Sequence, residues 1–63
     1  MKKEKLLDEK GAAKFLGLSV YTLRNWRHQL RPPNYIKLGG RAVRYRLADL
    51  EQFIEDSRIM RGL

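Results

Sequence analysis

The sequence predicts one small domain that is mainly α-helical and carries a single β-hairpin. Apolar residues recur at helical spacing in three separate segments of the chain. Between the second and third segments, apolar residues alternate on either side of a pair of glycines, as in a hairpin. With 63 residues and no cysteine, the chain has room for one domain with a small core and no disulfide framework.

The first helix is expected to begin after Asp8, because an aspartate N-cap accepts hydrogen bonds from the free backbone N–H groups of a first turn. Its apolar stripe consists of Ala12, Ala13 and Leu16. Gly17 is the expected stop, since glycine readily adopts the left-handed conformation that ends many helices.

The second helix is expected over Val20–His28, with Ser19 as its N-cap and Pro32-Pro33 preventing its continuation. The residues predicted to face inward are Val20, Leu23, Trp26 or Arg27, and Leu30. Only Gly17-Leu18-Ser19 then separates the two helices, and so short a turn predicts a helix-turn-helix arrangement.

Residues 35–38 and 42–45 are expected to pair as two strands around Gly39-Gly40, because glycines accommodate the positive φ angles of a tight turn. For a loop of either two or four residues, the strand alternation gives the same two faces. The core face would carry Ile36, Leu38, Val43 and Tyr45, and the opposite face Lys37, Arg44 and Arg46. Three cations on one small face repel one another unless a partner neutralises them.

A last helix is expected over about residues 47–57, where Leu50, Phe53, Ile54 and Ser57 follow helical spacing. The folded domain would then span residues 6–57. Residues 1–5 are expected to form a flexible basic tail, and residues 58–63 a frayed tail.

The charges are segregated along the chain. Fourteen Lys and Arg residues against seven Asp and Glu give a net charge of +7, yet residues 10–48 contain bases and no acid. A surface that needed only solubility would mix the two signs. The middle of the chain therefore predicts a binding face for a polyanion.

The second helix carries the residue types that read DNA. Its face opposite the apolar stripe carries Tyr21, Thr22, Arg24, Asn25 and His28. Arginine can bond guanine through two donors, asparagine can bond adenine in the same way, and threonine offers a hydroxyl or a methyl group. Such a helix fits a major groove about 12 Å wide, so the expected partner is double-stranded DNA.

Three segments resemble a known family. Residues 7–19 resemble the opening of the excisionase and AlpA-like group of small regulators within the MerR-type helix-turn-helix superfamily, and so does Thr22-Leu23-Arg24-Asn25-Trp26. Arg44-Tyr45-Arg46, followed by Asp49-Leu50-Glu51 and Phe53-Ile54, resembles that family's junction between wing and last helix. The resemblance covers about residues 6–56. The chain departs from the family at Gly11, where a glutamate is usual, and at Asn25-Trp26, where full activators have an aromatic pair.

The resemblance implies a winged helix-turn-helix of three helices and a two-stranded wing. The second helix would lie in the major groove, and residues 39–41 would contact the backbone or the minor groove. Thr22 and Arg24 match the family's contact positions, and Arg41 matches its basic wing tip. The coiled coil and effector domain of full MerR activators have no counterpart here, so no small-molecule effector is expected.

The resemblance also implies a function. It favours a prophage or mobile-element protein, either a transcriptional regulator or an excisionase, working in the cytoplasm on nucleoid DNA. Its partners would be DNA and an integrase or a second copy on adjacent sites. The candidate DNA-binding residues are Tyr21, Thr22, Arg24, Asn25, Arg27, His28, Lys37, Arg41, Arg44 and Arg46. An RNA-binding basic module and a protein-interaction adaptor remain alternatives.

Other chemistry finds little support in these residues. Ser19 has no recognisable base partner, so neither a catalytic site nor an enzyme is expected. His28 is the single histidine and has no carboxylate near it in sequence, so neither a metal site nor a cofactor is expected. The apolar runs are far shorter than the roughly 20 residues that span a bilayer, so no membrane association is expected.

Overall fold

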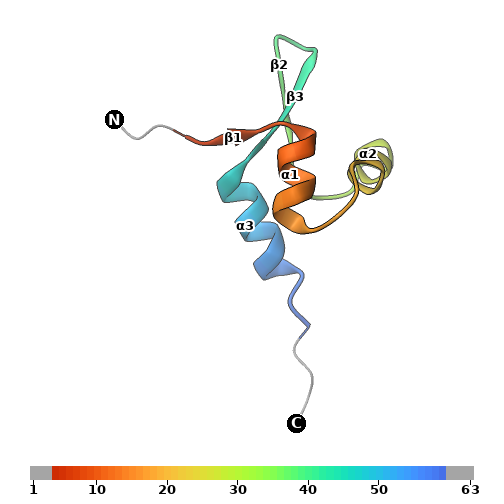
Figure 1. The fold of residues 1–63 in the computed structure, drawn as a ribbon, viewed down its shortest axis with the longest axis vertical. Helices are drawn as coiled ribbons and strands as arrows, with labels where there is room; N and C mark the ends of the chain where they lie inside the picture. The colour runs from red at the N-terminus through yellow and green to blue at the C-terminus, as the bar shows by residue number, and fades with distance from the viewer. Residues whose placement is uncertain (1–3, 60–63) are drawn as a thin grey trace.

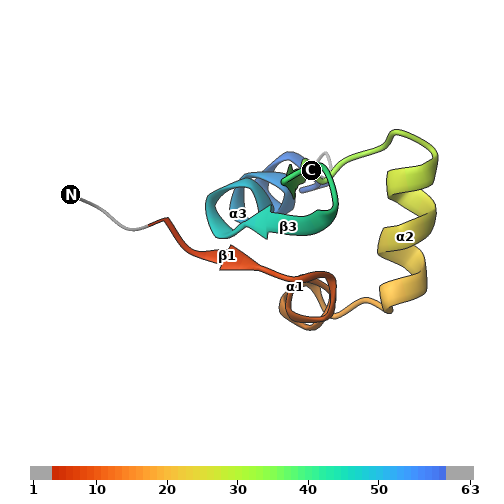
Figure 2. The same ribbon diagram turned by 90° about the horizontal axis from the view of Figure 1, so that it is seen from above.

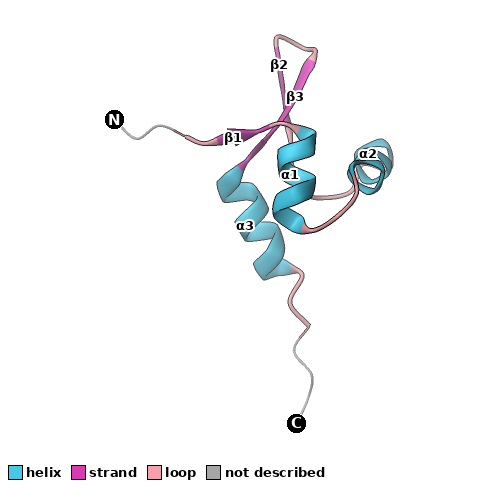
Figure 3. Cartoon of the chain, in the orientation of Figure 1, coloured by secondary structure: helices cyan, strands magenta, loops and turns pink. Residues whose placement is uncertain are grey.

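Three helices and three strands make up the structure, a computed structural model that describes residues 4–59. In chain order they are β1 (Leu6–Leu7), α1 (Glu9–Leu16), α2 (Val20–His28), β2 (Ile36–Leu38), β3 (Ala42–Arg46) and α3 (Leu47–Asp56) (Figure 1). The strands form one antiparallel sheet in the order β1-β3-β2, and the β2–β3 hairpin projects beyond the helices as a wing (Figure 3). The predicted fold class, a winged helix-turn-helix, is confirmed.

Side-chain caps set the beginnings of the first two helices. The Asp8 carboxylate accepts a hydrogen bond from the Gly11 backbone N–H at 2.7 Å, and the Ser19 hydroxyl accepts one from the Thr22 N–H at 3.1 Å. Gly17 has a φ of 71° and ends α1, where the next N–H, that of Leu18, reaches back to the Ala13 carbonyl at 2.8 Å. The predicted N-caps Asp8 and Ser19 and the predicted helix stop at Gly17 are therefore confirmed.

The core is centred on α1. Its two alanines, Ala12 and Ala13, are buried together with Leu23 of α2, Tyr45 of β3 and Leu50 of α3. In Figures 1 and 2, α1 stands between α2 on one side and α3 on the other. Small side chains at the centre allow α1 to contact both helices and β3 at the same time.

Trp26 closes the side of the core that faces α3. Its ring lies 5.8 Å from the ring of Phe53, measured between centroids, and packs against the buried cluster. The expectation that Trp26 faces inward is confirmed. Arg31 covers the outer face of the indole, with its guanidinium carbon 5.3 Å from the ring centroid.

The end of α2 differs from the prediction. Leu30 was expected to face inward, but its side chain is 88% exposed. The helix ends at His28, and Leu30 has a φ of 59°, in the left-handed region. The N–H groups of Leu30 and Arg31 reach back to the carbonyls of Arg27 and Trp26 at 3.1 and 2.8 Å, which closes the helix end. This reversal of the chain turns the Leu30 side chain away from the apolar stripe.

The predicted faces of β2 are wrong, because the loop contains three residues rather than two or four. Leu38 pairs with Ala42 and Lys37 pairs with Val43. An odd loop length inverts the alternation of one strand relative to the other. Lys37 therefore shares the face of Val43, whereas Leu38 is 46% exposed.

The same inversion separates Ile36 from the core face. Ile36 pairs with Arg44 and lies on the side opposite Val43 and Tyr45. The predicted faces of β3 itself are confirmed, since Tyr45 is buried and Val43 packs against the core. The turn is also confirmed: Gly39 and Gly40 have φ angles of 60° and 72°, and the Arg41 N–H donates to the Leu38 carbonyl at 3.1 Å.

Strand β1 was not predicted. It pairs with β3, with Leu6 opposite Arg46 and Leu7 opposite Tyr45. The backbone carbonyl of Lys5 accepts a hydrogen bond from the Leu47 N–H at 3.0 Å. Of the two predicted tails, residues 1–3 and 60–63 lie outside the described residues.

The two helix ends offer a test of backbone strain. A left-handed leucine costs roughly 1–2 kcal/mol, and glycine relieves this at an entropic cost of about 0.5–1 kcal/mol. Leu30→Gly should therefore raise the free energy of unfolding by about 0.5–1 kcal/mol, measured by urea denaturation.

Two further variants test whether backbone conformation causes the expected gain in stability. Gly17→Ala should lower the unfolding free energy by about 1 kcal/mol, because its φ is 71° and an added Cβ would meet nothing within 4 Å, which leaves conformation as the cause. Gln29→Gly is the matched control, because Gln29 has an ordinary φ of −86°. A gain from Gln29→Gly equal to that from Leu30→Gly would exclude backbone strain as the explanation.

Candidate nucleic-acid interface

A groove runs between α2 and the wing. One part of it is lined by Arg24, Arg27, His28, Tyr35, Lys37, Arg41 and Val43. It continues to the start of α1, where the lining is Asp8, Glu9, Lys10, Arg24, Arg27, Arg41, Val43 and Arg44. We call these residues together the basic groove. Cations from α1, α2, the loop and both strands of the wing meet there, although they are far apart in the sequence.

The outward face of α2 carries the predicted side chains. Tyr21, Arg24, Asn25 and His28 are exposed, and Tyr21, at 76%, is far more open than the half-buried Tyr35 and the buried Tyr45. Thr22 is half-buried, and its hydroxyl lies 3.0 Å from the Ser19 hydroxyl, within the cap of the helix. The Arg24 guanidinium lies 6.0 Å from the centre of the Tyr21 ring.

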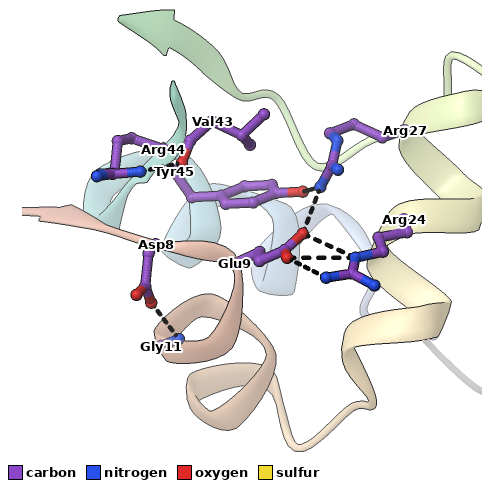
Figure 4. Close-up of polar contacts among 8 residues, drawn as sticks. All are labelled: Asp8, Glu9, Gly11, Arg24, Arg27, Val43, Arg44 and Tyr45. Atoms are coloured by element: carbon purple, nitrogen blue, oxygen red, sulfur yellow. Dashed lines mark hydrogen bonds and ion pairs between the residues drawn. The ribbon is translucent and has the colours of Figure 1, made fainter. Parts of the chain in front are cut away.

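Glu9 holds two arginines of the groove (Figure 4). The Arg24 Nε donates to both carboxylate oxygens, at 3.1 and 3.2 Å, and the Arg24 Nη2 donates to Oε2 at 2.5 Å. The Arg27 Nη1 donates to Oε1 at 3.3 Å. One carboxylate on α1 therefore fixes two guanidinium groups on α2.

Arg27 is turned inward rather than toward solvent. Its Nη1 also donates to the Tyr45 hydroxyl at 3.1 Å, and its guanidinium lies 5.7 Å from the centre of the Tyr35 ring. A buried tyrosine, a second tyrosine ring and a carboxylate surround this side chain. Arg27 thus connects α2 to the wing and lines the groove with a side chain that is mostly buried.

The basic side chains of the wing lie in three different settings. Lys37 and Arg41 are exposed and line the groove. Arg44 also lines it, although its Nη1 folds back to donate to the Val43 carbonyl at 2.8 Å. Arg46 is at the other end of β3, where it pairs with Glu4 at 3.1 Å. The structure therefore brings Lys37, Arg41 and Arg44 to one groove and leaves Arg46 outside it.

Sequence reasoning missed Glu9. It stands in the first turn of α1, where an acid is expected simply because it suits the positive end of the helix. Its partners are 15 and 18 positions away, so no local spacing reveals them. Lys10 and Tyr35, which also line the groove, were not singled out either.

The geometry of the groove defines a class of protein. A second helix with an exposed cationic face, beside a basic wing, is the arrangement of a small DNA-binding helix-turn-helix protein. The family comparison agrees. Residues 6–58 match the model of the helix-turn-helix domain family, and the chain belongs to that family. No match was found among curated proteins or solved structures.

Within residues 4–59, no helix is long and apolar enough to cross a bilayer. The same part of the chain holds no group of three or more acidic or histidine side chains arranged to bind a metal ion.

The ion pairs change the titration of Glu9. Hydrogen bonds from Arg24 hold the pKa of the Glu9 carboxyl below its ordinary value of 4.5, and the charges of both arginines act in the same direction. Partial burial opposes the change without reversing it. The carboxylate therefore stays ionised in the folded protein at pH values where it would begin to be protonated in the unfolded chain.

This difference predicts a pH-dependent contribution to stability. A lowered pKa in the folded state stabilises the fold at pH values above the pKa of the unfolded chain, and the stabilisation is lost as the pH falls through the folded pKa. Glu9→Gln should therefore lower the unfolding free energy by up to about 1 kcal/mol at neutral pH and by progressively less in acid. Urea denaturation of both proteins across this range measures the effect. If the difference is the same in acid and at neutral pH, or persists when Arg24→Ala is present in both proteins, the Glu9–Arg24 pair is not its source.

Proposed function

We propose that this protein is a sequence-specific DNA-binding regulator of the excisionase and AlpA-like group in the MerR-type superfamily. The helix α2 would lie in the major groove, and residues 39–41 of the wing would contact the backbone or the adjacent minor groove. The observation that carries this proposal is the basic groove, which exposed cations from α2 and from the wing line together.

The separation of α2 into an exposed polar face and a buried apolar face supports an orientation in which the helix reads the major groove. Arg24 and Asn25 are exposed and have the donor patterns that recognise guanine and adenine. Leu23 on the opposite side is buried, so it fixes the rotation of the helix about its axis. A reading helix needs this fixed rotation, because a shift of one residue would present different side chains to the bases.

The wing supports backbone contact. Arg41 is exposed at the loop, where Gly39 and Gly40 add no side chain that would obstruct its approach. Lys37 extends the same cationic surface along β2. Cations placed this way bind phosphates or the narrow minor groove of A·T-rich DNA.

RNA binding is less well supported. Modules that read single-stranded RNA stack bases on exposed aromatic rings, often on a sheet. Here the tyrosines of the hairpin pack against each other, with 6.2 Å between the ring centroids of Tyr35 and Tyr45, and Tyr45 is buried. The deep, narrow major groove of duplex RNA would also exclude α2.

Within this function, two roles use the same contacts. A transcriptional regulator would change promoter access, and an excisionase would bend DNA and assist an integrase or a second copy on an adjacent site. Footprinting on DNA that flanks the protein's own gene tests the first role. An excision assay with the integrase of the same element tests the second. The expected place of action for both is nucleoid DNA in the cytoplasm.

The dependence of binding on salt tests the phosphate contacts. Each neutralised phosphate contributes about −0.9 to the slope of log K against log salt, so four or five contacts predict a slope of roughly −4. Titration of a random-sequence DNA duplex by fluorescence anisotropy measures it. Affinity that stays constant from low to moderate salt would contradict DNA binding and favour a protein-interaction adaptor, and equal affinity for an RNA duplex would favour the RNA module.

A matched pair of lysines sharpens the test. Lys37→Ala should reduce the size of the slope by about one unit, because Lys37 lines the groove. Lys14→Ala removes the same charge from an exposed position on α1 outside the basic groove, and it should leave the slope unchanged. Equal effects of the two variants would mean that general charge, rather than the groove, attracts DNA.

Arg41 separates binding from stability. Because Arg41 is exposed, Arg41→Ala should change the unfolding free energy by less than about 0.5 kcal/mol. DNA affinity should nevertheless fall about tenfold, since a charge-assisted contact to phosphate or to the minor groove is lost. Thermal melting and a DNA titration on the same variant decide the question. Unchanged affinity would restrict the contact surface to α2.

A further inference from the structure

An acid in the lining of a groove that otherwise gathers cations weakens the attraction of that groove for DNA, so its presence requires a physical explanation. Two acids line the groove, Asp8 and Glu9, but the Asp8 carboxylate caps α1. Glu9 instead faces the arginines of α2, and its side chain is 24% exposed. Its charge repels phosphate and weakens the attraction that cations such as Lys10 and Arg41 supply.

The geometry of the Arg24 guanidinium shows what Glu9 can contribute. A guanidinium has five N–H donors arranged in a rigid plane. Glu9 occupies the side edge of that plane, because its carboxylate accepts from Nε and Nη2. The end edge, made by Nη1 and the second N–H of Nη2, takes no part in these bonds. That end edge has the spacing of the N7 and O6 acceptors of guanine.

Glu9 is itself positioned by a side chain that is anchored to the core. Arg27 donates both to the Glu9 carboxylate and to the hydroxyl of buried Tyr45. The Arg27 side chain is only 20% exposed, whereas that of Arg24 is 51% exposed. The order from the core outward is therefore Tyr45, Arg27, Glu9 and Arg24, and each member positions the next (Figure 4).

An arginine held in this way behaves differently from a free one. A free guanidinium on a flexible stem can follow phosphates of any sequence. One whose side edge is bonded to a carboxylate has lost most of its rotational freedom, and the carboxylate offsets its positive charge, but the two donors of its end edge stay available. Such a group discriminates between bases more than it attracts backbone.

We propose that Glu9 is a specificity-determining residue, which positions Arg24 to bond guanine through its end edge and withholds it from phosphates. This inference rests on the proposed binding of α2 in the major groove of DNA. Glu9 is a positioning residue, since it acts on the bases through Arg24.

The test uses the full chain and three kinds of duplex, all of equal length. The first is the sequence that the wild-type protein enriches from a library of randomised duplexes. The second is the same duplex with 7-deazaguanine in place of each guanine in turn, which removes the N7 acceptor. The third is an alternating A·T duplex, which contains no guanine and reports binding to the backbone.

The wild-type protein should lose about tenfold in affinity at one substituted guanine. In Glu9→Gln that loss should shrink to about threefold or less, and affinity for the A·T duplex should rise about threefold to tenfold, because Arg24 becomes available to phosphates. In proteins that carry Arg24→Ala, adding Glu9→Gln should no longer change the response to 7-deazaguanine.

Two controls separate position from charge. Glu51→Gln removes the same charge from an exposed position on α3 outside the groove, and it should leave the loss at 7-deazaguanine unchanged. Glu9→Asp keeps the charge but shortens the side chain by one methylene. It should keep A·T affinity low while losing part of the discrimination at guanine.

Several results would overturn the inference. The full loss at 7-deazaguanine in Glu9→Gln would mean that Glu9 does not position Arg24. Equal weakening on all three duplexes would mean that Glu9 only supports the fold, and thermal melting of the variant would show the same. A wild-type protein that tolerates 7-deazaguanine everywhere would exclude guanine reading by Arg24, although a steep salt dependence would still support DNA binding. Absence of binding to all three duplexes would remove the proposed function as well.

Discussion

The hydroxyl of Tyr45 imposes the constraint on which the binding surface depends. Tyr45 is among the largest of the fully buried side chains, and a buried hydroxyl without a hydrogen-bond partner is costly, by about 1–3 kcal/mol on mutational evidence. Arg27 supplies the partner by turning inward from α2. A partly buried guanidinium needs an acceptor in turn, and Glu9 of α1 provides it. The requirement of one core residue thus fixes α1, α2 and β3 relative to one another.

The first two helices owe their positions to local chemistry as well as to the core. A chain of this size buries little apolar surface, so individual caps and turns account for a large share of its stability. Asp8 and Ser19 fix where α1 and α2 begin, and Gly17 lets the chain reverse between them. Because the turn is short, α2 has little freedom to rotate, and the burial of Leu23 in the core decides which side chains of α2 face outward. Substitutions within this turn would consequently change the stability of the fold and the orientation of α2 together.

The sequence was most informative where structure depends on neighbouring residues. Caps, the glycine stop and the helical stripes follow local rules, and they were predicted correctly at Asp8, Gly17 and Ser19. Prediction failed where one residue changes the length of a loop or the direction of the backbone. Arg41 extends the hairpin loop to three residues and so inverts the faces of β2. The left-handed backbone of Leu30 turns its own side chain outward, although that side chain was predicted to face the core. Strand β1 is two residues long, too short to show any periodicity, and it exists because β3 offers a free edge.

The candidate site was likewise predicted in part: its exposed residues follow from local sequence, but their contacts depend on the fold. Helical periodicity alone identified the exposed face of α2, including Arg24 and Asn25. The roles of the arginines could not follow from periodicity, because they depend on a carboxylate that reaches α2 only after the chain has folded. Net charge counts every cation of the groove alike, yet the structure separates them. Arg24 and Arg27 are bound to Glu9, whereas Lys37 and Arg41 line the groove as exposed side chains. A single carboxylate therefore divides the cations of one small surface into two that it pairs with and restrains and others that stay exposed, and this division is the physical basis of the different roles proposed for them.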